Sequence, residues 1–348
     1  DVPEPSGPTM DLTATNIVIA TGAKPRPLPG NPFAGALIDS TQALEVNEFP
    51  SSAVIIGAGA IALEFASMWN AAGSKVTLLI RKDRVLSAWD RRAGTTLTRE
   101  LKRHGVNIIT RASVTHVDTG ANLGATVHYT CEGQDGEQSV WGEIALVAIG
   151  RDPITDPAWG VTIDDHGHVA TDAYGRTDKP GVWAVGDVTA GHALAHRAFE
   201  QGIVIAETIA GLNPKPVDEA TVPQIVFSFP EAASVGLTVE QAQAREDLIE
   251  IKETNYPMLA NARMLMSGTA GSLTIVSGCD AANPDTPRVL GVHMVSQMAS
   301  DIIAEAEQLV GNHVPLADAA RLVHPHPTFS ETLGEALLKA DGRPLHTR

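Results

Sequence analysis

The sequence has 348 residues, of which 43% are hydrophobic and 19% are charged, and this length suits two or three domains that each bury a core. Its 25 basic and 41 acidic side chains give a formal net charge of −16, which disfavours nucleic acid and anionic membrane surfaces as partners. No apolar run approaches the roughly 20 residues that span a bilayer, and only two cysteines favour a reducing, cytoplasmic setting over a disulfide scaffold.

Short β-branched runs alternate with longer amphipathic segments, which is the pattern of βαβ units around a parallel sheet. In chain order we predict strands at 17–21, 53–56 and 76–80, helices at 60–72 and 91–104, antiparallel strands at 112–117, 126–131 and 139–141, and a strand at 145–149. A strand at 181–185 then leads into a long helix at 193–210. These segments predict an α/β fold.

The pattern changes after the proline-rich linker at 213–216. Beyond it, predicted strands at 224–227, 272–276 and 289–295 alternate with helices at 239–245, 299–310 and 331–339. This order is typical of an α+β region with a mostly antiparallel sheet. We expect three regions, the first of which is split in sequence by the second.

The clearest ligand signal is the turn between strand 53–56 and helix 60–72, which reads Gly57-x-Gly59-x-x-Ala62. The first glycine permits the tight turn, the second lets the backbone approach a pyrophosphate at the helix N-terminus, and the third position must be small for helix–strand packing. Strands before and after the helix favour a dinucleotide site. A glycine-rich turn without a ligand is the alternative.

The end of strand 76–80 bears on the choice between NAD and NADP. NAD sites usually place a carboxylate there for the ribose hydroxyls, whereas an arginine suits a 2′-phosphate. This chain has Ile80 followed by Arg81, Lys82, Asp83 and Arg84, which favours NADPH. A solvated basic turn explains the same charges.

A second ligand is indicated after the strand at 181–185. Gly186-Asp187 places a carboxylate at the end of that strand, where a turn or cap residue is the simpler explanation. The next helix opens at Ala193-Leu194-Ala195-His196 and presents backbone N–H groups nearby, which makes a cofactor role for Asp187 credible.

The most unusual stretch is His324-Pro325-His326-Pro327-Thr328-Phe329-Ser330-Glu331. Its prolines predict an extended approach, and Ser330 is the expected cap of a helix that starts near Glu331. Across this junction Glu331 can orient the imidazole of His326 and raise its basicity, as in a general base. A structural His–Glu pair is the alternative, and no further ligands at suitable spacing support a metal here.

Taken in order, these segments resemble the pyridine nucleotide–disulfide oxidoreductases, most closely the dihydrolipoamide dehydrogenases. The resemblance runs from about residue 16 to the C-terminus. It is carried by A-T-G-A-K-P-R-P-L-P-G, G-A-G-A-I-A-L-E-F-A-S-M-W, A-I-G-R-D-P, G-V-W-A-V-G-D-V, L-A-H-R-A-F-E-Q-G, V-F-S-F-P-E-A-A-S-V-G-L-T and H-P-H-P-T-F-S-E.

The resemblance implies a Rossmann-like NAD(P)-binding domain at 49–150, inserted in a partial FAD-binding domain at 1–48 and 151–213, and followed by an α+β dimerisation domain at 214–348. The residues that it places against the nicotinamide nucleotide are Gly57, Gly59, Ala62, Glu64 and Arg81. Those that it places against FAD are Gly22, Arg151, Gly186, Asp187, Leu194, Ala195 and His196. His326, with Glu331 as its partner, would be the acid/base that serves the substrate thiol across a homodimer interface.

The activity implied by the resemblance is oxidation of a small or protein-bound dihydrolipoyl dithiol, with electrons passed through a disulfide and FAD to NAD or NADP. A 2-oxoacid dehydrogenase complex is a partner that it allows. The family's FAD-binding G-x-G-x-x-G turn and C-x-x-x-x-C redox pair are absent from this sequence, and Cys131 and Cys279 lie far apart without a neighbouring base. We therefore expect an N-terminally truncated chain that binds FAD weakly or not at all and is inactive alone.

Two alternatives stay open. The Ile80-Arg81 pair resembles the NADPH-dependent glutathione reductases and fits an NADPH-dependent reductase of a low-molecular-weight disulfide such as glutathione or mycothiol. The missing redox cysteines fit a catalytically dead nucleotide-binding and dimerisation module.

Overall fold

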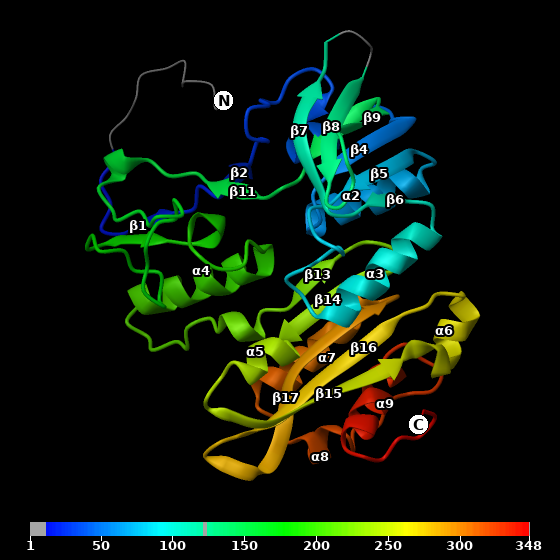
Figure 1. Cartoon of the computed structure of the whole chain (residues 1–348). Coiled ribbons are helices and arrows are strands. Elements are labelled where there is room, and N and C mark those ends of the chain that lie inside the picture. The colour runs from blue at the N-terminus through cyan, green and yellow to red at the C-terminus, as the bar shows by residue number, and fades with distance from the viewer. Residues whose placement is uncertain (1–11, 121–123, 348) are drawn as a thin grey trace. The chain divides into compact units, whose positions relative to one another are not determined.

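The computed structural model describes residues 12–120 and 124–347, which form two compact units (Figure 1). Unit 1 lies within residues 1–24 and 152–219, and unit 2 within 25–151 and 220–348. The chain thus completes unit 1 only after an excursion into unit 2, which is the kind of insertion that the sequence indicates. The three predicted domain boundaries stay a prediction.

A five-stranded parallel sheet lies in unit 2, and its strand order is β3-β10-β4-β5-β6. The strands are β3 (Leu37–Ile38), β10 (Ile144–Val147), β4 (Ser52–Ile56), β5 (Lys75–Leu79) and β6 (Asn107–Ile109). The helices of this region are α1 (Ser40–Leu44), α2 (Ala60–Ala71) and α3 (Arg91–Arg103). Parallel neighbours joined through helices confirm the predicted Rossmann-like α/β class.

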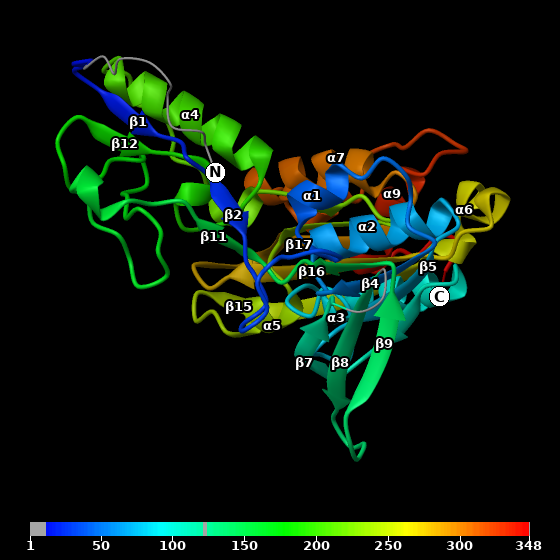
Figure 2. The ribbon, with the colours of Figure 1, turned by 90° about the horizontal axis from the view of Figure 1, so that it is seen from above.

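Side-chain alternation decides what covers each face of this sheet. Ala53 and Ile55 of β4 point into a core shared with α2 and α3, whereas Val54 and Ile56 point into a second core with β7, β8 and β9. The three covering strands, β7 (Ala112–Asp118), β8 (Ala125–Cys131) and β9 (Gln138–Gly142), form an antiparallel sheet. Figure 2 shows α2 and this small sheet on opposite sides of β4 and β5.

The second sheet of unit 2 is antiparallel, with the order β13-β14-β17-β16-β15. Its strands are β13 (Gln224–Val226), β14 (Glu231–Gly236), β17 (Asn283–Ser296), β16 (Ser272–Asp280) and β15 (Leu248–Pro257). The helices around it are α5 (Val239–Gln243), η4 (Met258–Ala260), α6 (Ala262–Ser267), α7 (Ala299–Gly311), α8 (Leu316–Ala319) and α9 (Glu331–Ala340). The α+β layout is confirmed, although β14 and β15 were not predicted.

The two sheets of unit 2 share apolar core. Val226, Ala232 and Val295 of the antiparallel sheet are buried in the same cluster as the side chains of α2 and α3. Fully buried Trp69 lies in that cluster and packs on Phe65 with ring centroids 5.1 Å apart. Truncating a buried aromatic side chain of this kind costs roughly 3–5 kcal/mol.

Unit 1 is smaller and contains a two-stranded parallel ladder of β1 (Ile17–Ile19) and β12 (Val182–Ala184). Its other elements are η1 (Pro157–Trp159), η2 (Gly186–Val188) and α4 (Ala195–Ile209), and the connecting segments hold the paired strands β2 (Ala23–Pro25) and β11 (Arg151–Pro153) and the short helix η3 (Glu219–Thr221). Helix α4 begins two residues after the predicted start because Leu194 is still extended and serves as the N-cap. No helix among the described residues combines the length and hydrophobicity of a membrane-spanning segment.

Candidate functional site

The turn from β4 into α2 has the backbone that a dinucleotide site requires. Gly57 has φ +143°, and a Cβ added there would lie 2.8 Å from the carbonyl carbon of Ala148, so only glycine fits. Its N–H donates to the carbonyl of Leu79 at 3.1 Å, which fixes the turn against β5. The close approach of the Ala148 carbonyl therefore explains why this position must be glycine, as predicted.

Gly59 and Ala62 complete this turn in different ways. Gly59 is the N-cap of α2 and has no side chain to cap the helix, and a Cβ added there would meet open space. Ala62 is fully buried, where a larger side chain would push the helix off the sheet. An open, uncapped helix N-terminus presents backbone N–H groups and positive dipole density to an anion, so these residues fit a pyrophosphate.

The basic segment after β5 does not act as one cluster. Arg81 and Lys82 are exposed, and no described residue forms a hydrogen bond or ion pair with either side chain. Arg84 instead turns inward, pairs with Asp83 at 3.2 Å and donates to the carbonyl of Ser87 at 3.0 Å. Two of the three predicted cations are thus available to a phosphate, and the third stabilises the loop.

Glu64 has a structural contact that sequence reasoning missed. Its carboxylate accepts the backbone N–H of Phe227 at 3.0 Å, and one turn later Ser67 accepts that of Phe229 at 3.2 Å. These bonds connect α2 to the segment after β13. The predicted place of Glu64 near the nicotinamide stays a prediction.

In unit 1, Gly186 and Asp187 follow β12, as predicted. Gly186 has φ +78°, and its N–H donates to the side-chain oxygen of Gln201 at 2.9 Å. Within the part of the chain that the structure describes, the carboxylate of Asp187 has no hydrogen-bond or ion-pair partner. An unpartnered, half-buried carboxylate at a strand end suits a ligand hydroxyl.

The structure shows where the other predicted flavin-binding residues lie, and their roles stay predictions. The N–H of Leu194 donates to the carbonyl of His192 at 2.9 Å. Leu194 is the N-cap of α4, and Ala195 and His196 lie in the first turn of the helix. The carbonyl of Gly22 accepts the N–H of Ile154 at 2.9 Å. Arg151 is half-buried at the start of β11.

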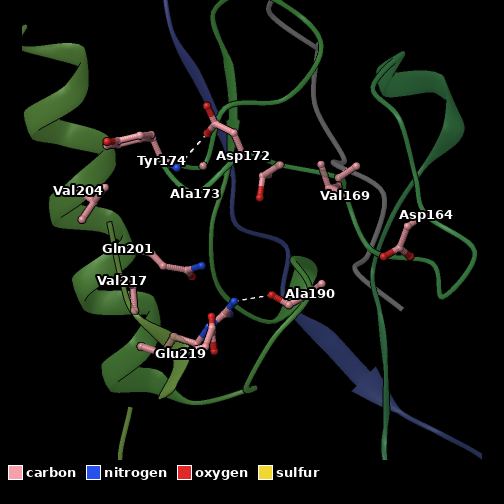
Figure 3. A pocket seen from close by; sticks show the side chains of 14 residues that line it. Asp164, Val169, Asp172, Ala173, Tyr174, Ala190, Gln201, Val204, Val217 and Glu219 are labelled. Atoms are coloured by element: carbon pink, nitrogen blue, oxygen red, sulfur yellow. Dashed lines mark hydrogen bonds and ion pairs between the residues drawn. The ribbon is translucent and has the colours of Figure 1, made fainter. Parts of the chain in front are cut away.

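A cavity of about 460 Å³ in unit 1 lies beside α4 (Figure 3). Gln201 projects from α4 toward it, and buried Arg197 forms an ion pair with Glu219 and donates to the carbonyl of Ala190. Because Gln201 also holds Gly186, the cavity adjoins the predicted flavin-binding turn. Neither Arg197 nor Gln201 stands out in the sequence, since both are polar positions of an amphipathic helix.

The structure brings His326 and Glu331 together. Nδ1 of His326 lies 2.7 Å from Oε1 of Glu331, and Oε2 of the same carboxylate accepts the backbone N–H of Thr328 at 2.8 Å. The imidazole is 73% exposed and the carboxylate 15% exposed. Burial raises the pKa of Glu331, but the Thr328 N–H and the imidazole outweigh burial and lower that pKa below its usual range.

The expected cap at Ser330 is wrong. Ser330 has helical φ and ψ, and its side chain makes no capping bond. Its hydroxyl lies 2.9 Å from that of Thr328, which also donates to the carbonyl of Pro325 at 2.7 Å. The N–H groups of Thr332 and Leu333 donate instead to the carbonyls of Phe329 and Ser330, at 3.1 and 3.0 Å. Glu331 holds the Thr328 N–H of the preceding loop, so that loop and the orientation of His326 depend on the same carboxylate.

His324, two residues earlier, forms a different His–Glu pair. Its Nε2 lies 3.0 Å from Oε1 of Glu305 on α7, and its side chain is only 9% exposed. The ring packs against α9 at Gly334, where an added Cβ would lie 2.7 Å from Cε1 of His324. His324 thus anchors the loop to two helices, which leaves His326 at its exposed end.

The dyad has the geometry of a general base. With Nδ1 held by a carboxylate, the imidazole has a fixed orientation, and Nε2 has no partner among the residues that the structure describes. Cys131 and Cys279 are both buried, and burial raises the pKa of the Cys279 thiol. That neither cysteine has a redox role stays a prediction.

Comparison with known proteins identifies the class of the chain. Residues 2–202 match the family model "Pyridine nucleotide-disulphide oxidoreductase", and residues 222–337 match the dimerisation domain of the same family. The chain belongs to the pyridine nucleotide-disulphide oxidoreductase family and is an oxidoreductase. The resemblance carried by its motifs is thereby confirmed.

Individual relatives are dihydrolipoyl dehydrogenases. The one from Cupriavidus necator is 38% identical over 341 residues, which are 96% of this chain and 70% of that protein. The one from Bacillus subtilis is 36% identical, with the same coverage of 96% and 70%. Among solved structures, LpdA from Mycobacterium tuberculosis superposes with a TM-score of 0.82 at 27% identity and covers 93% of this chain and 69% of its own. The flavoprotein disulfide reductase RclA from Escherichia coli gives 0.81 at 27% identity, covering 92% and 73%.

Proposed function

We propose that this chain provides the nicotinamide-nucleotide site and the acid/base dyad of a flavoprotein that oxidises a dihydrolipoyl dithiol. The observation that carries the proposal is the 2.7 Å contact between Nδ1 of His326 and Glu331, because it leaves the opposite nitrogen to exchange a proton with a thiol. The names of the relatives, dihydrolipoyl dehydrogenases at 33–38% identity, support this choice of substrate.

In the proposed reaction His326 takes a proton from the substrate thiol through Nε2. The resulting thiolate attacks a protein disulfide, and the second substrate thiol then displaces the mixed disulfide, so the substrate leaves as a disulfide and two protein sulfurs are reduced. Glu331 stabilises the imidazolium while it holds the proton. Cys131 and Cys279 are both buried and unpaired, so neither is proposed to form the disulfide that is attacked.

Two cofactors are proposed for this protein. The turn at Gly57 and Gly59 would hold the nicotinamide nucleotide by its pyrophosphate, with Glu64 and Arg81 nearby. Gly22, Arg151, Asp187 and the start of α4 would contact FAD. When bound, FAD would supply the two-electron redox chemistry that links the reduced sulfurs to the nicotinamide.

The proposed assembly is a homodimer, which the matched dimerisation domain at 222–337 supports. Its proposed compartment is the cytoplasm, since both described cysteines are free thiols. A 2-oxoacid dehydrogenase complex is the proposed larger partner.

The deciding experiment uses enzyme expressed from the complete reading frame that encodes this chain. Dihydrolipoamide should reduce NAD⁺, followed as NADH absorbance, and glutathione disulfide with NADPH should give no turnover. Turnover with glutathione or mycothiol disulfide alone would replace the proposal by the low-molecular-weight reductase. Absence of every dithiol or disulfide activity, with nucleotide binding retained, would favour the catalytically dead module.

One observation favours the NADPH-dependent alternative, namely the unpartnered Arg81 and Lys82 after β5. If a 2′-phosphate binds there, Arg81→Glu weakens NADPH binding about tenfold or more and leaves NADH binding unchanged. Lys215→Glu, the same charge change at an exposed position of unit 1, is the control. An NADPH affinity that Arg81→Glu leaves unchanged would argue against a 2′-phosphate site here and favour NAD.

A further inference from the structure

Two histidines that have no part in the proposed redox site face each other on the small antiparallel sheet of unit 2. His116 of β7 and His128 of β8 are direct cross-strand partners. Asp118 lies two residues beyond His116 and therefore shares its face of the strand. The opposite face of β8 packs into the core through Val127 and Tyr129, so the three polar side chains are on the outer face.

A register shift in β7 creates this arrangement. The pairing slips between Val114 and His116, and as a result Thr115 and His116 are both exposed. The hydroxyl of Thr115 donates to Oε1 of Glu137 at 2.7 Å. The bulge thus places His116 opposite His128 and also fixes a carboxylate beside the pair.

The two rings are stacked, with centroids 4.0 Å apart and planes 9° from parallel. Both rings present Nε2 to the same oxygen of Asp118, at 3.1 Å from His128 and 3.8 Å from His116. Both present Nδ1 to Glu137, at 3.6 Å from His128 and 3.9 Å from His116. One edge of the stack therefore faces Asp118 and the other faces Glu137.

A simple ion-pair cluster does not account for this stack. Two imidazolium rings in contact repel each other, and exposed ion pairs contribute little to stability, roughly 0–1 kcal/mol. Neutral imidazoles beside a carboxylate are instead the donor set of zinc, copper and nickel, whereas magnesium and calcium prefer oxygen alone. One ligand atom from each of His116, Asp118 and His128 already lies within 4.8 Å of the others.

We propose that His116, His128 and Asp118 bind one divalent transition-metal ion through the two Nε2 atoms and a carboxylate oxygen. Bond lengths of about 2.0–2.2 Å require the rings to pivot toward each other, and the exposed fractions of 47% for His116 and 23% for His128 leave room for that rotation. Glu137 then accepts the Nδ1–H groups and holds both imidazoles in the ligating tautomer. Water completes the coordination.

The test is Zn²⁺ binding by the untagged chain, stripped with chelator and titrated near neutral pH against a chromogenic zinc indicator. We expect one ion per chain, bound at micromolar concentration or tighter. His116→Ala and His128→Ala should each weaken binding at least about tenfold, and Asp118→Asn several-fold. His166→Ala removes an exposed histidine outside the cluster and should change nothing.

Three further readouts distinguish this site from adventitious binding. Zn²⁺ affinity should fall in acid, because protons compete with the metal for the ligand atoms. Mg²⁺ in excess should not compete. Substoichiometric Cu²⁺ should show electron paramagnetic resonance splitting from two imidazole nitrogens, lost in His116→Ala. Absence of Zn²⁺ binding, or unchanged binding in the His116→Ala/His128→Ala double variant, would overturn the proposal without bearing on the redox function.

Discussion

Two histidine–glutamate pairs lie at the two ends of one short loop, and they differ mainly in what surrounds the imidazole. His324 is 9% exposed, bonded to Glu305 of α7 and packed against Gly334. His326 is 73% exposed and bonded to Glu331, the first residue of α9. The buried pair fixes the loop, and the exposed pair keeps one ring nitrogen open to a reactant. Similar chemistry therefore serves stability in one place and, in our proposal, proton transfer in the other.

The largest expected effect is on activity, from His326→Gln in enzyme expressed from the complete reading frame. Glutamine cannot cycle a proton, so dithiol oxidation should fall about 100- to 10,000-fold, while the unfolding free energy changes by less than about 0.5 kcal/mol. Steady-state rates and urea unfolding measure the two quantities. Activity within twofold of the parent would remove His326 from the mechanism.

Gly334→Ala tests the packing beneath His324. Alanine normally stabilises a helix interior by about 1 kcal/mol over glycine, but here its Cβ overlaps the imidazole, and we expect a loss of roughly 1–3 kcal/mol. Gly202→Ala in α4, where an added Cβ meets nothing within 4 Å, is the matched control and should stabilise. Stabilisation by both substitutions would show that the ring is not held against α9.

Glu305→Gln tests the buried pair through pH. The bond to Glu305 raises the pKa of His324 above 6.5 despite the opposing effect of burial. The pair therefore stabilises the fold fully below that value, and its contribution disappears as pH rises through the folded pKa. The difference in unfolding free energy between the parent and Glu305→Gln should shrink from acid to alkaline pH; a constant difference would indicate packing alone.

The smallest effect is expected for Glu331→Gln on stability. The pKa of Glu331 lies below 4.5, so its contribution is present above that value and disappears as pH falls through the folded pKa. With an exposed partner, the change should be about 1 kcal/mol or less. Urea unfolding across the acid range measures it, and the two glutamate variants should differ from the parent at opposite ends of the pH scale.

Local signals in the sequence were sufficient to predict the glycine turn before α2 and the contact between His326 and Glu331. Gly57, Gly59 and Ala62 follow one another on a strand–helix junction, and His326 and Glu331 are five residues apart. In both cases the interacting groups are close in the chain, so short-range geometry brings them together. The same argument correctly predicted the parallel sheet, whose apolar strands are separated by amphipathic helices.

Non-local pairings were missed. β14 contains alanines and a serine, and β15 is largely charged or polar, so neither shows the alternation of a half-buried strand. Glu305 meets His324 across 19 residues, and His116 meets His128 only because a bulge sets the register of β7. Such contacts depend on packing and register, which single-sequence patterns do not encode.

The core common to both sheets of unit 2 has a thermodynamic consequence. Val226, Ala232 and Val295 cannot leave it without exposing α2 and α3, and the bonds from Glu64 and Ser67 would break with them. Separate melting of the two sheets would therefore be costly, and they should unfold in one cooperative transition. A nucleotide that binds at the Gly59 helix end would then protect amide hydrogens in the distant antiparallel strands against exchange, by mass action alone.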